Sequence, residues 1–109
     1  MLELPGQEFL ESLIVRNPEK QKPMHRIAII YFTAKWCKAC KNLNIKDLES
    51  LRNDIAWYKC DIDRLQYTST YCDVQSIPSF MAIVDGKCSE TISRFTDEQL
   101  RQWILRLGH

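Results

Sequence analysis

The fold is decided by residues 26–41, which read RIAIIYFTAKWCKACK. The stretch from Arg26 to Phe32 is a nearly continuous run of β-branched and aromatic residues, which is typical of a strand buried on both faces of a sheet. Directly behind it come Cys37 and Cys40, separated by two residues. Two cysteines at this spacing are compatible with half of a metal site, with a structural disulfide, or with a pair that is oxidised and reduced in turn.

Length and composition limit the class of protein. The chain has 109 residues, of which 45% are hydrophobic and 27% are charged, and this predicts one globular domain spanning residues 1–109. A net charge of +1 gives no general attraction to nucleic acid or to anionic membranes. The longest apolar run, Ile27 to Ile30, is too short to cross a bilayer, and the first residues lack the pattern of a secretory signal. We therefore expect a cytoplasmic protein that binds neither nucleic acid nor membrane.

Hydrophobic periodicity predicts the elements on either side of the cysteine pair. We expect strands at 2–4, 26–32, 55–62, 79–84 and 88–95, and helices at 7–16, from the cysteines to 51, at 65–72 and at 96–107. The Asp85-Gly86 pair between two extended runs indicates a hairpin. The resulting order, β-α-β-α-β-α-β-β-α, predicts an α/β fold of three layers, with helices on both faces of a central mixed sheet.

The position of the cysteines favours redox chemistry. Cys37 falls where a buried strand gives way to a helix, and free backbone amides at a helix start stabilise a negative charge. This placement predicts a lowered pKa for the Cys37 thiol. Cys40 lies one turn further on, within disulfide reach, and should be the more buried of the two. Three nearby lysines (Lys35, Lys38 and Lys41) add a positive charge that solvent screens in part.

The other two interpretations have less support. A structural disulfide around so short a loop contributes about 2 kcal/mol and needs an oxidising compartment. A zinc ion or an iron–sulfur cluster needs about four ligands. The remaining cysteines, Cys60, Cys72 and Cys88, form no second pair of this spacing, and the two histidines are not at ligand spacing. We therefore predict a reversible dithiol and no metal site.

The chain resembles the thioredoxin family along nearly its whole length. The resemblance rests on an amphipathic C-terminal helix and on three motifs, FTAKWCKACK at 32–41, YKCDID at 58–63 and SIPSF at 76–80. It implies the thioredoxin fold and the activity of a protein-disulfide reductase with a redox-active centre. Such a protein takes part in electron transport and in cell redox homeostasis.

The resemblance also assigns roles to residues. Cys37 would be the attacking nucleophile and Cys40 the resolving cysteine, joined by a disulfide in the oxidised form. Trp36, Ile77 and Pro78 would line the substrate groove, with a cis peptide before the proline. No cofactor would be bound, since a thioredoxin reductase dependent on NADPH or ferredoxin would supply the electrons. The partners would be this reductase and proteins with disulfides, and the protein would act as a monomer.

Two departures from the family concern the chemistry of the pair. The dipeptide between the cysteines is usually Gly-Pro, whereas here it is Lys38-Ala39, and this predicts a more oxidising redox potential. The aspartate that the family buries six residues before the first cysteine is replaced by Tyr31. A phenol with a pKa of about 10 is a poor general base near neutral pH, so resolution by Cys40 should be slow. Lys59 matches the usual partner of that aspartate, and we expect it to reach solvent or to contact Tyr31.

Two further departures concern shape and partners. Ile45 replaces a proline that kinks the second helix, so we expect a straighter helix. Arg94 and Phe95 stand where a glycine normally leaves the groove open. A filled, cationic groove predicts a narrower set of targets, among them acidic segments. It also keeps open a second hypothesis, a non-catalytic binding module in which the cysteine pair is a redox switch.

Overall fold

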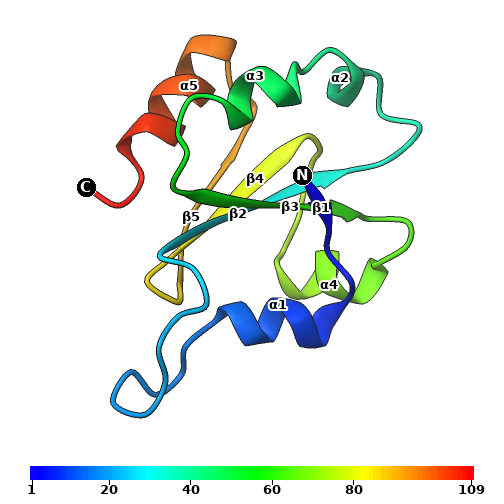
Figure 1. The fold of residues 1–109 in the computed structure, drawn as a ribbon. Helices are drawn as coiled ribbons and strands as arrows, with labels where there is room; N and C mark the ends of the chain where they lie inside the picture. Colours follow the sequence, from blue (N-terminus) through cyan, green and yellow to red (C-terminus); the bar gives the residue numbers. More distant parts are fainter.

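The computed structural model describes all residues from 1 to 109. Five strands form one sheet in the order β1-β3-β2-β4-β5 (Figure 1). The three strands β1, β3 and β2 run parallel, whereas β4 is antiparallel to β2 and β5 is antiparallel to β4. The elements follow one another as β1 (Leu2–Glu3), α1 (Gln7–Leu13), β2 (Ile27–Thr33), α2 (Lys38–Lys41), α3 (Ile45–Glu49), β3 (Ile55–Asp61), α4 (Gln66–Tyr71), β4 (Ser79–Val84), β5 (Lys87–Ser93) and α5 (Asp97–Arg106). The predicted mixed sheet and element order are confirmed, except that two short helices replace the second helix.

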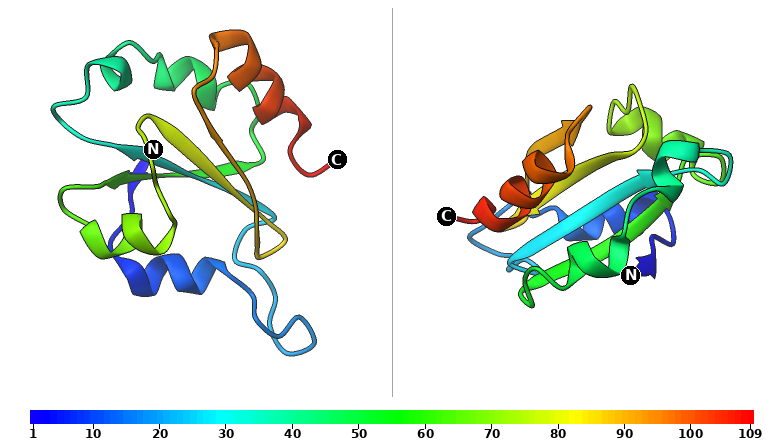
Figure 2. Two further views of the ribbon diagram at one scale, coloured as in Figure 1. Left: turned by 180° about the vertical axis from the view of Figure 1, so that it is seen from behind. Right: turned by 90° about the horizontal axis from the view of Figure 1, so that it is seen from above.

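Helices cover both faces of the sheet. Helices α2, α3 and α5 lie on one face and α1 and α4 on the other, as Figures 1 and 2 show from three directions. The central strand β2 is buried from Ile27 to Phe32, and its side chains alternate between two cores. The core under α2, α3 and α5 takes Ile27, Ile29 and Tyr31, and the opposite core takes Ala28, Ile30 and Phe32. None of the helices is both long and apolar enough to cross a membrane.

The second helix differs from the sequence-based expectation. The absence of proline at Ile45 does not make it straight, because the helix is interrupted at 42–44. Asn44 is the N-cap of α3, and its Oδ1 accepts the backbone N–H of Asp47 at 3.2 Å. Asparagine side chains compete with the helical backbone for hydrogen bonds and favour caps, so Ile45 begins a new helix here. The expectation of a straighter helix was therefore wrong.

The C-terminal end of α5 is held by a buried arginine. Arg52 Nη1 donates to the carbonyl oxygens of Ile104 at 2.9 Å and Leu107 at 2.6 Å. The same guanidinium pairs with both carboxylate oxygens of Asp54, at 2.8 and 2.6 Å, and the arginine side chain is only 11% exposed. The last carbonyls of a helix have no partner within it, so Arg52 provides a donor for Leu107 O and a second donor for Ile104 O, which also accepts the backbone N–H of Leu107 at 3.3 Å. This contact fixes α5 over the same face of the sheet as α2.

We expect Arg52→Met to lower the free energy of unfolding by about 1–3 kcal/mol, because it leaves the carbonyl oxygen of Leu107 without a donor. The measurement is the midpoint of denaturant unfolding, with the slope of the transition unchanged. Arg16→Met is the matched control, since the Arg16 side chain is 70% exposed and its ion pair with Glu11 spans 3.6 Å. The control should change stability by less than about 0.5 kcal/mol. Equal effects of the two substitutions would refute a capping role for Arg52.

Candidate active site

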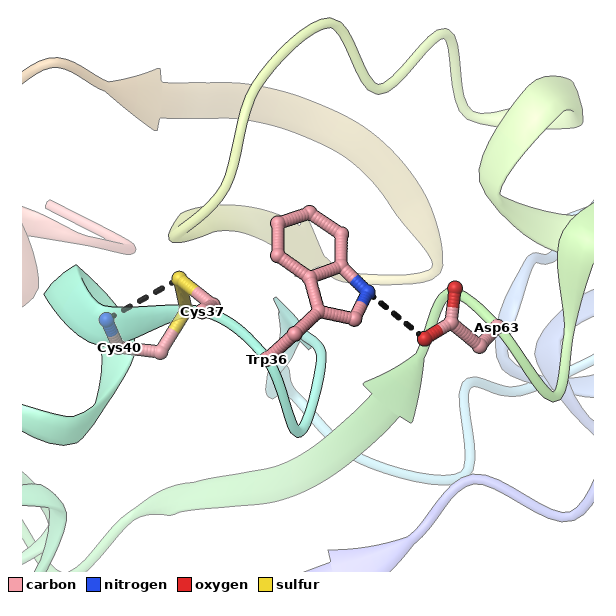
Figure 3. Close-up of a disulfide and its surroundings, with 4 residues drawn as sticks. All are labelled: Trp36, Cys37, Cys40 and Asp63. Atoms are coloured by element: carbon pink, nitrogen blue, oxygen red, sulfur yellow. Dashed lines mark hydrogen bonds between the residues drawn. A yellow bond between two sulfur atoms is a disulfide. The ribbon is translucent and has the colours of Figure 1, made fainter.

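The cysteine pair lies just beyond the end of the central strand. Residues 34–36 form a short turn after β2, and Cys37 is the N-cap of α2. The two cysteines are joined by a disulfide with their Cα atoms 5.3 Å apart (Figure 3). The Sγ of Cys37 accepts the backbone N–H of Cys40 at 3.1 Å. In the reduced protein the same N–H is positioned to stabilise a thiolate at Cys37.

Burial does not distinguish the two cysteines as the sequence predicted. Cys37 is 5% exposed and Cys40 is 7% exposed. The expectation that Cys40 would be the more buried residue was therefore wrong for the oxidised form. The disulfide holds the two sulfur atoms side by side, so the surrounding residues cover both to nearly the same extent.

Trp36 lies on the surface beside the disulfide. It is 63% exposed, and its indole Nε1 donates to Oδ2 of Asp63 at 2.8 Å. Figure 3 shows the indole between the disulfide and this carboxylate. Asp63 follows the end of β3, where its backbone N–H donates to Oδ1 of Asp61 at 2.9 Å. The exposed tryptophan is therefore oriented by a carboxylate from the neighbouring strand end.

Sequence reasoning missed Asp63 as a site residue. A signal for it exists in the predicted topology. Strands β2 and β3 are parallel, and Thr33 pairs with Asp61, so the residues after both strands meet at one edge of the sheet. A polar residue after β3 was therefore a candidate neighbour of the residues before Cys37.

A groove borders the cysteine pair on the side of the cis-proline loop. The Ile77-Pro78 peptide is cis, as the family resemblance implies, and both residues are half-buried. A pocket of about 250 Å³ is lined by Ala39, Leu43, Ser76, Ile77, Pro78, Arg94 and Phe95. The pocket thus extends from Ala39, one of the two residues between the cysteines, to the proline loop and to Arg94 and Phe95, the residues expected to fill the groove.

Tyr31 does not replace the missing aspartate in chemical terms. It is buried, and its ring stacks on Phe80 with the centroids 4.8 Å apart. Burial raises the pKa of Tyr31, although a hydrogen bond with the Thr33 side chain and the charge of Lys59 oppose this shift. The phenol therefore keeps its proton near neutral pH, which makes it a weak base.

Lys59 is engaged at the edge of the sheet. Its Nζ forms an ion pair with Oε1 of Glu3 at 3.0 Å, and its side chain is 43% exposed. It is close enough to Tyr31 for its charge to act on that residue's pKa. The sequence offered solvent or Tyr31 as alternatives for Lys59, and the structure shows an exposed lysine whose direct partner is a carboxylate from β1.

Positive charge surrounds the disulfide on the surface. Lys35, Lys38 and Lys41 are exposed, and none of them forms an ion pair. Solvent screens such charges, so their effect on the thiolate is smaller than that of the direct backbone N–H. The structure leaves all three lysines available to an anionic partner.

The other three cysteines lie apart from the disulfide. Burial raises the pKa of Cys60 to about 11 and that of Cys72 to about 12, and it also raises the pKa of the exposed Cys88. Thiols with these values are almost fully protonated at neutral pH. No group of three or more His, Cys, Asp and Glu side chains is placed to hold a metal ion.

Comparisons with known proteins agree with this geometry. The family model described as Thioredoxin matches residues 13–106. Thioredoxin-1 of Caenorhabditis elegans is 31% identical over 101 residues, which cover 91% of this chain and 83% of that protein. Thioredoxin H3 of Arabidopsis thaliana is 27% identical over 96 residues, covering 86% of this chain and 77% of the relative.

Solved structures show the same likeness in three dimensions. Mitochondrial thioredoxin 3 of Saccharomyces cerevisiae, in its oxidized form, superimposes with a TM-score of 0.84 over 98% of this chain and 95% of that one. The two sequences are 24% identical, so this match shows the fold alone. The thioredoxin of Fasciola hepatica gives a TM-score of 0.80 at 28% identity, covering 97% of this chain and 98% of its own.

We expect alkylation of the reduced protein at neutral pH to modify Cys37 first and to leave Cys60 and Cys72 unmodified. The reason is that a backbone N–H is directed at the sulfur of Cys37, whereas burial keeps Cys60 and Cys72 protonated. Peptide mapping by mass spectrometry after a short pulse of iodoacetamide measures the order. The oxidised protein is the control and should lose the Cys37 signal. Labelling of Cys72 as fast as Cys37 would contradict the assignment.

Proposed function

The chain belongs to the thioredoxin family and is a thiol–disulfide oxidoreductase, and from this premise we propose that it reduces disulfide bonds in other proteins. The proposal is supported by one observation above all. At the start of α2, the sulfur of Cys37 accepts a backbone N–H and lies in bonding contact with the sulfur of Cys40. A nucleophile stabilised as an anion and a second thiol within reach are the two groups that disulfide exchange requires.

In the first step, the thiolate of Cys37 attacks one sulfur of the target disulfide. A new sulfur–sulfur bond forms to Cys37, the target bond breaks, and the second target sulfur leaves as a thiolate that takes a proton from solvent. The backbone N–H of Cys40 stabilises the attacking anion before the reaction. Exposed Trp36 and half-buried Ile77 and Pro78 supply the surface that contacts the target.

In the second step, Cys40 resolves the mixed disulfide. Its thiol loses a proton, and the resulting thiolate attacks the sulfur of Cys37. The bond between Cys37 and the target breaks, and the remaining target sulfur leaves as a thiolate. Two electrons have then passed from the dithiol to the target, and Cys37 and Cys40 form the disulfide seen in the structure. Because Tyr31 keeps its proton, solvent accepts the proton of Cys40.

A thioredoxin reductase dependent on NADPH or ferredoxin would return the disulfide to the dithiol form, so the protein itself needs no bound cofactor. Its targets would be disulfide-containing proteins, among them proteins with acidic segments that the exposed lysines attract. We infer a cytoplasmic setting, because five cysteines are an odd number and do not suggest a disulfide framework. We also propose that the protein acts as a monomer.

A second candidate function is a binding module that keeps the cysteine pair as a redox switch. Two observations favour it, the raised pKa of Tyr31 and the presence of Arg94 and Phe95 in the lining of the pocket. A module of this kind would hold one partner in one redox state and would turn over no disulfides.

We expect the protein to reduce insulin disulfides with dithiothreitol as electron donor, and Cys37→Ser to return the rate to that of dithiothreitol alone. The reason is that the substitution removes the nucleophile whose sulfur accepts the backbone N–H of Cys40. The turbidity of precipitating insulin chains measures the rate. Cys72→Ser is the matched control and should retain activity, because that thiol lies outside the site. A wild-type rate no higher than the dithiothreitol background would leave the binding module as the function.

We expect resolution by Cys40 to depend steeply on pH. With no internal base, the rate should rise about tenfold per pH unit between about pH 6 and pH 8, as more Cys40 ionises. Decay of a preformed mixed disulfide with a fluorescent peptide thiol, followed by stopped flow, measures this rate. The profile of Tyr31→Phe should superimpose on that of the wild type, because burial raises the pKa of Tyr31 and keeps it protonated throughout this range. A plateau near neutral pH that disappears in the variant would make Tyr31 the base after all.

A further inference from the structure

The pocket beside the disulfide has a single charged residue in its lining. Its walls are mostly apolar, since Leu43, Ile77, Pro78 and Phe95 take part in them, and the cis peptide forms one side. Ala39, which separates the two cysteines, borders the same pocket of about 250 Å³. No acidic residue lines the pocket. A cationic side chain at its rim can therefore pair with a carboxylate of a bound partner, because no carboxylate of the protein lies in the pocket to pair with it.

That cation is Arg94, which has no partner within the protein. The residue is exposed and forms neither a hydrogen bond nor an ion pair. The acidic residues that follow it are engaged elsewhere: Asp97 accepts from Arg101 Nε at 2.7 Å, and Glu98 accepts from Gln102 Nε2 at 3.1 Å. The guanidinium of Arg94 is therefore free to bind a carboxylate.

The backbone at Arg94 has an unusual conformation for an arginine. Its φ angle is +55°, in the left-handed region that glycine adopts more readily than any other residue. The chain turns here from the end of β5 toward α5, so the turn itself favours a small residue. A long cationic side chain in this backbone conformation costs conformational energy, and a function of the side chain would explain why arginine occupies the position.

The opposite charge lies on the other side of Trp36. The indole separates the carboxylate of Asp63 from the disulfide (Figure 3), and neither Trp36 nor Asp63 lines the pocket. A target strand that crosses the disulfide thus meets a cation where it enters the pocket and an anion where it passes the indole. This arrangement differs from the evenly distributed surface lysines, which attract an acidic partner without fixing its direction.

We infer that Arg94 determines specificity and selects targets with an acidic residue on the one side of the reactive cysteine that enters the pocket. The inference rests on the proposed reductase function and names a substrate class for the same site. An aspartate or glutamate at this position would pair with the planar guanidinium, and its methylene groups would pack on Pro78 and Phe95. The same residue on the other side of the cysteine would approach Asp63 and be repelled.

The test uses three disulfide-linked peptides with one cysteine context and different neighbours: glutamate before the cysteine, glutamate after it, and glutamine at both positions. We expect the wild-type protein to reduce one of the two glutamate peptides with a kcat/KM about threefold to tenfold higher than the other two peptides. Arg94→Lys should keep part of this preference, and Arg94→Asn should lower the kcat/KM on the preferred glutamate peptide to that on the glutamine peptide. Asparagine is suited to the test because it tolerates a positive φ angle.

Two further variants keep the outcome interpretable. Lys87→Gln removes an exposed, unpaired cation from the opposite end of β5 and should preserve the preference. If Arg94→Asn does not fold, Arg94→Gly replaces it, because glycine adopts this backbone conformation without strain.

The possible failures are distinguishable. Equal rates on all three peptides, or a preference that survives in Arg94→Asn, would overturn the role of Arg94 and leave the reductase function standing. Rates on all three peptides no higher than those of dithiothreitol alone would overturn the reductase function and this inference together.

Discussion

The central strand β2 is hydrogen-bonded to a neighbour on each edge and packed against helices on each face, and the position of the reactive cysteines depends on where it ends. Its buried residues cannot shift along the sheet without exposing one core and overfilling the other. The turn at 34–36 therefore starts from a fixed point, and it places Cys37 at the first free amides of α2. The hydrogen bond from Cys40 N–H to Cys37 Sγ then follows from local geometry. The chemistry of this protein is thus set by the register of a buried strand.

Tyr31 lies in an aromatic cluster within the same core as Cys37 and Cys40. Tyr31 stacks on Phe80, and Trp57 packs edge-on against the same ring, so an aromatic cluster fills the space where the family commonly keeps a carboxylate. Such a cluster stabilises the fold by burial of apolar area and needs no charged partner. Lys59 accordingly pairs with Glu3 at the sheet edge. Because burial raises the pKa of Tyr31, this residue is not ionised near neutral pH, and the proposed mechanism therefore passes the proton of Cys40 to solvent.

The surface around the site combines a general and a local electrostatic effect. The exposed lysines act at a distance and are screened by salt, and they raise the rate of encounter with anionic partners. Arg94 at the pocket and Asp63 beyond Trp36 act at contact distance and have opposite charge. We infer that these two groups give a bound chain a direction as well as an affinity. The exposed lysines alone would attract many anionic partners in any orientation, whereas Arg94 and Asp63 together would favour fewer of them.

The sequence by itself determined the strands, the hairpin at Asp85-Gly86 and the place of the cysteines at a helix start, because these depend on periodicity, turn residues and capping within a few neighbours. The tertiary structure alone decided three features: the hydrogen bond from Trp36 to Asp63, the ion pair of Lys59 with Glu3, and the nearly equal burial of the two cysteines. Each of these joins residues whose distance is set by strand register and by the disulfide. The break in the helix before Ile45 was determined partly by the sequence and partly by the tertiary structure. The capping residue Asn44 can be recognised in the sequence. A capped break and a continued helix have similar energies, however, so packing selects between them.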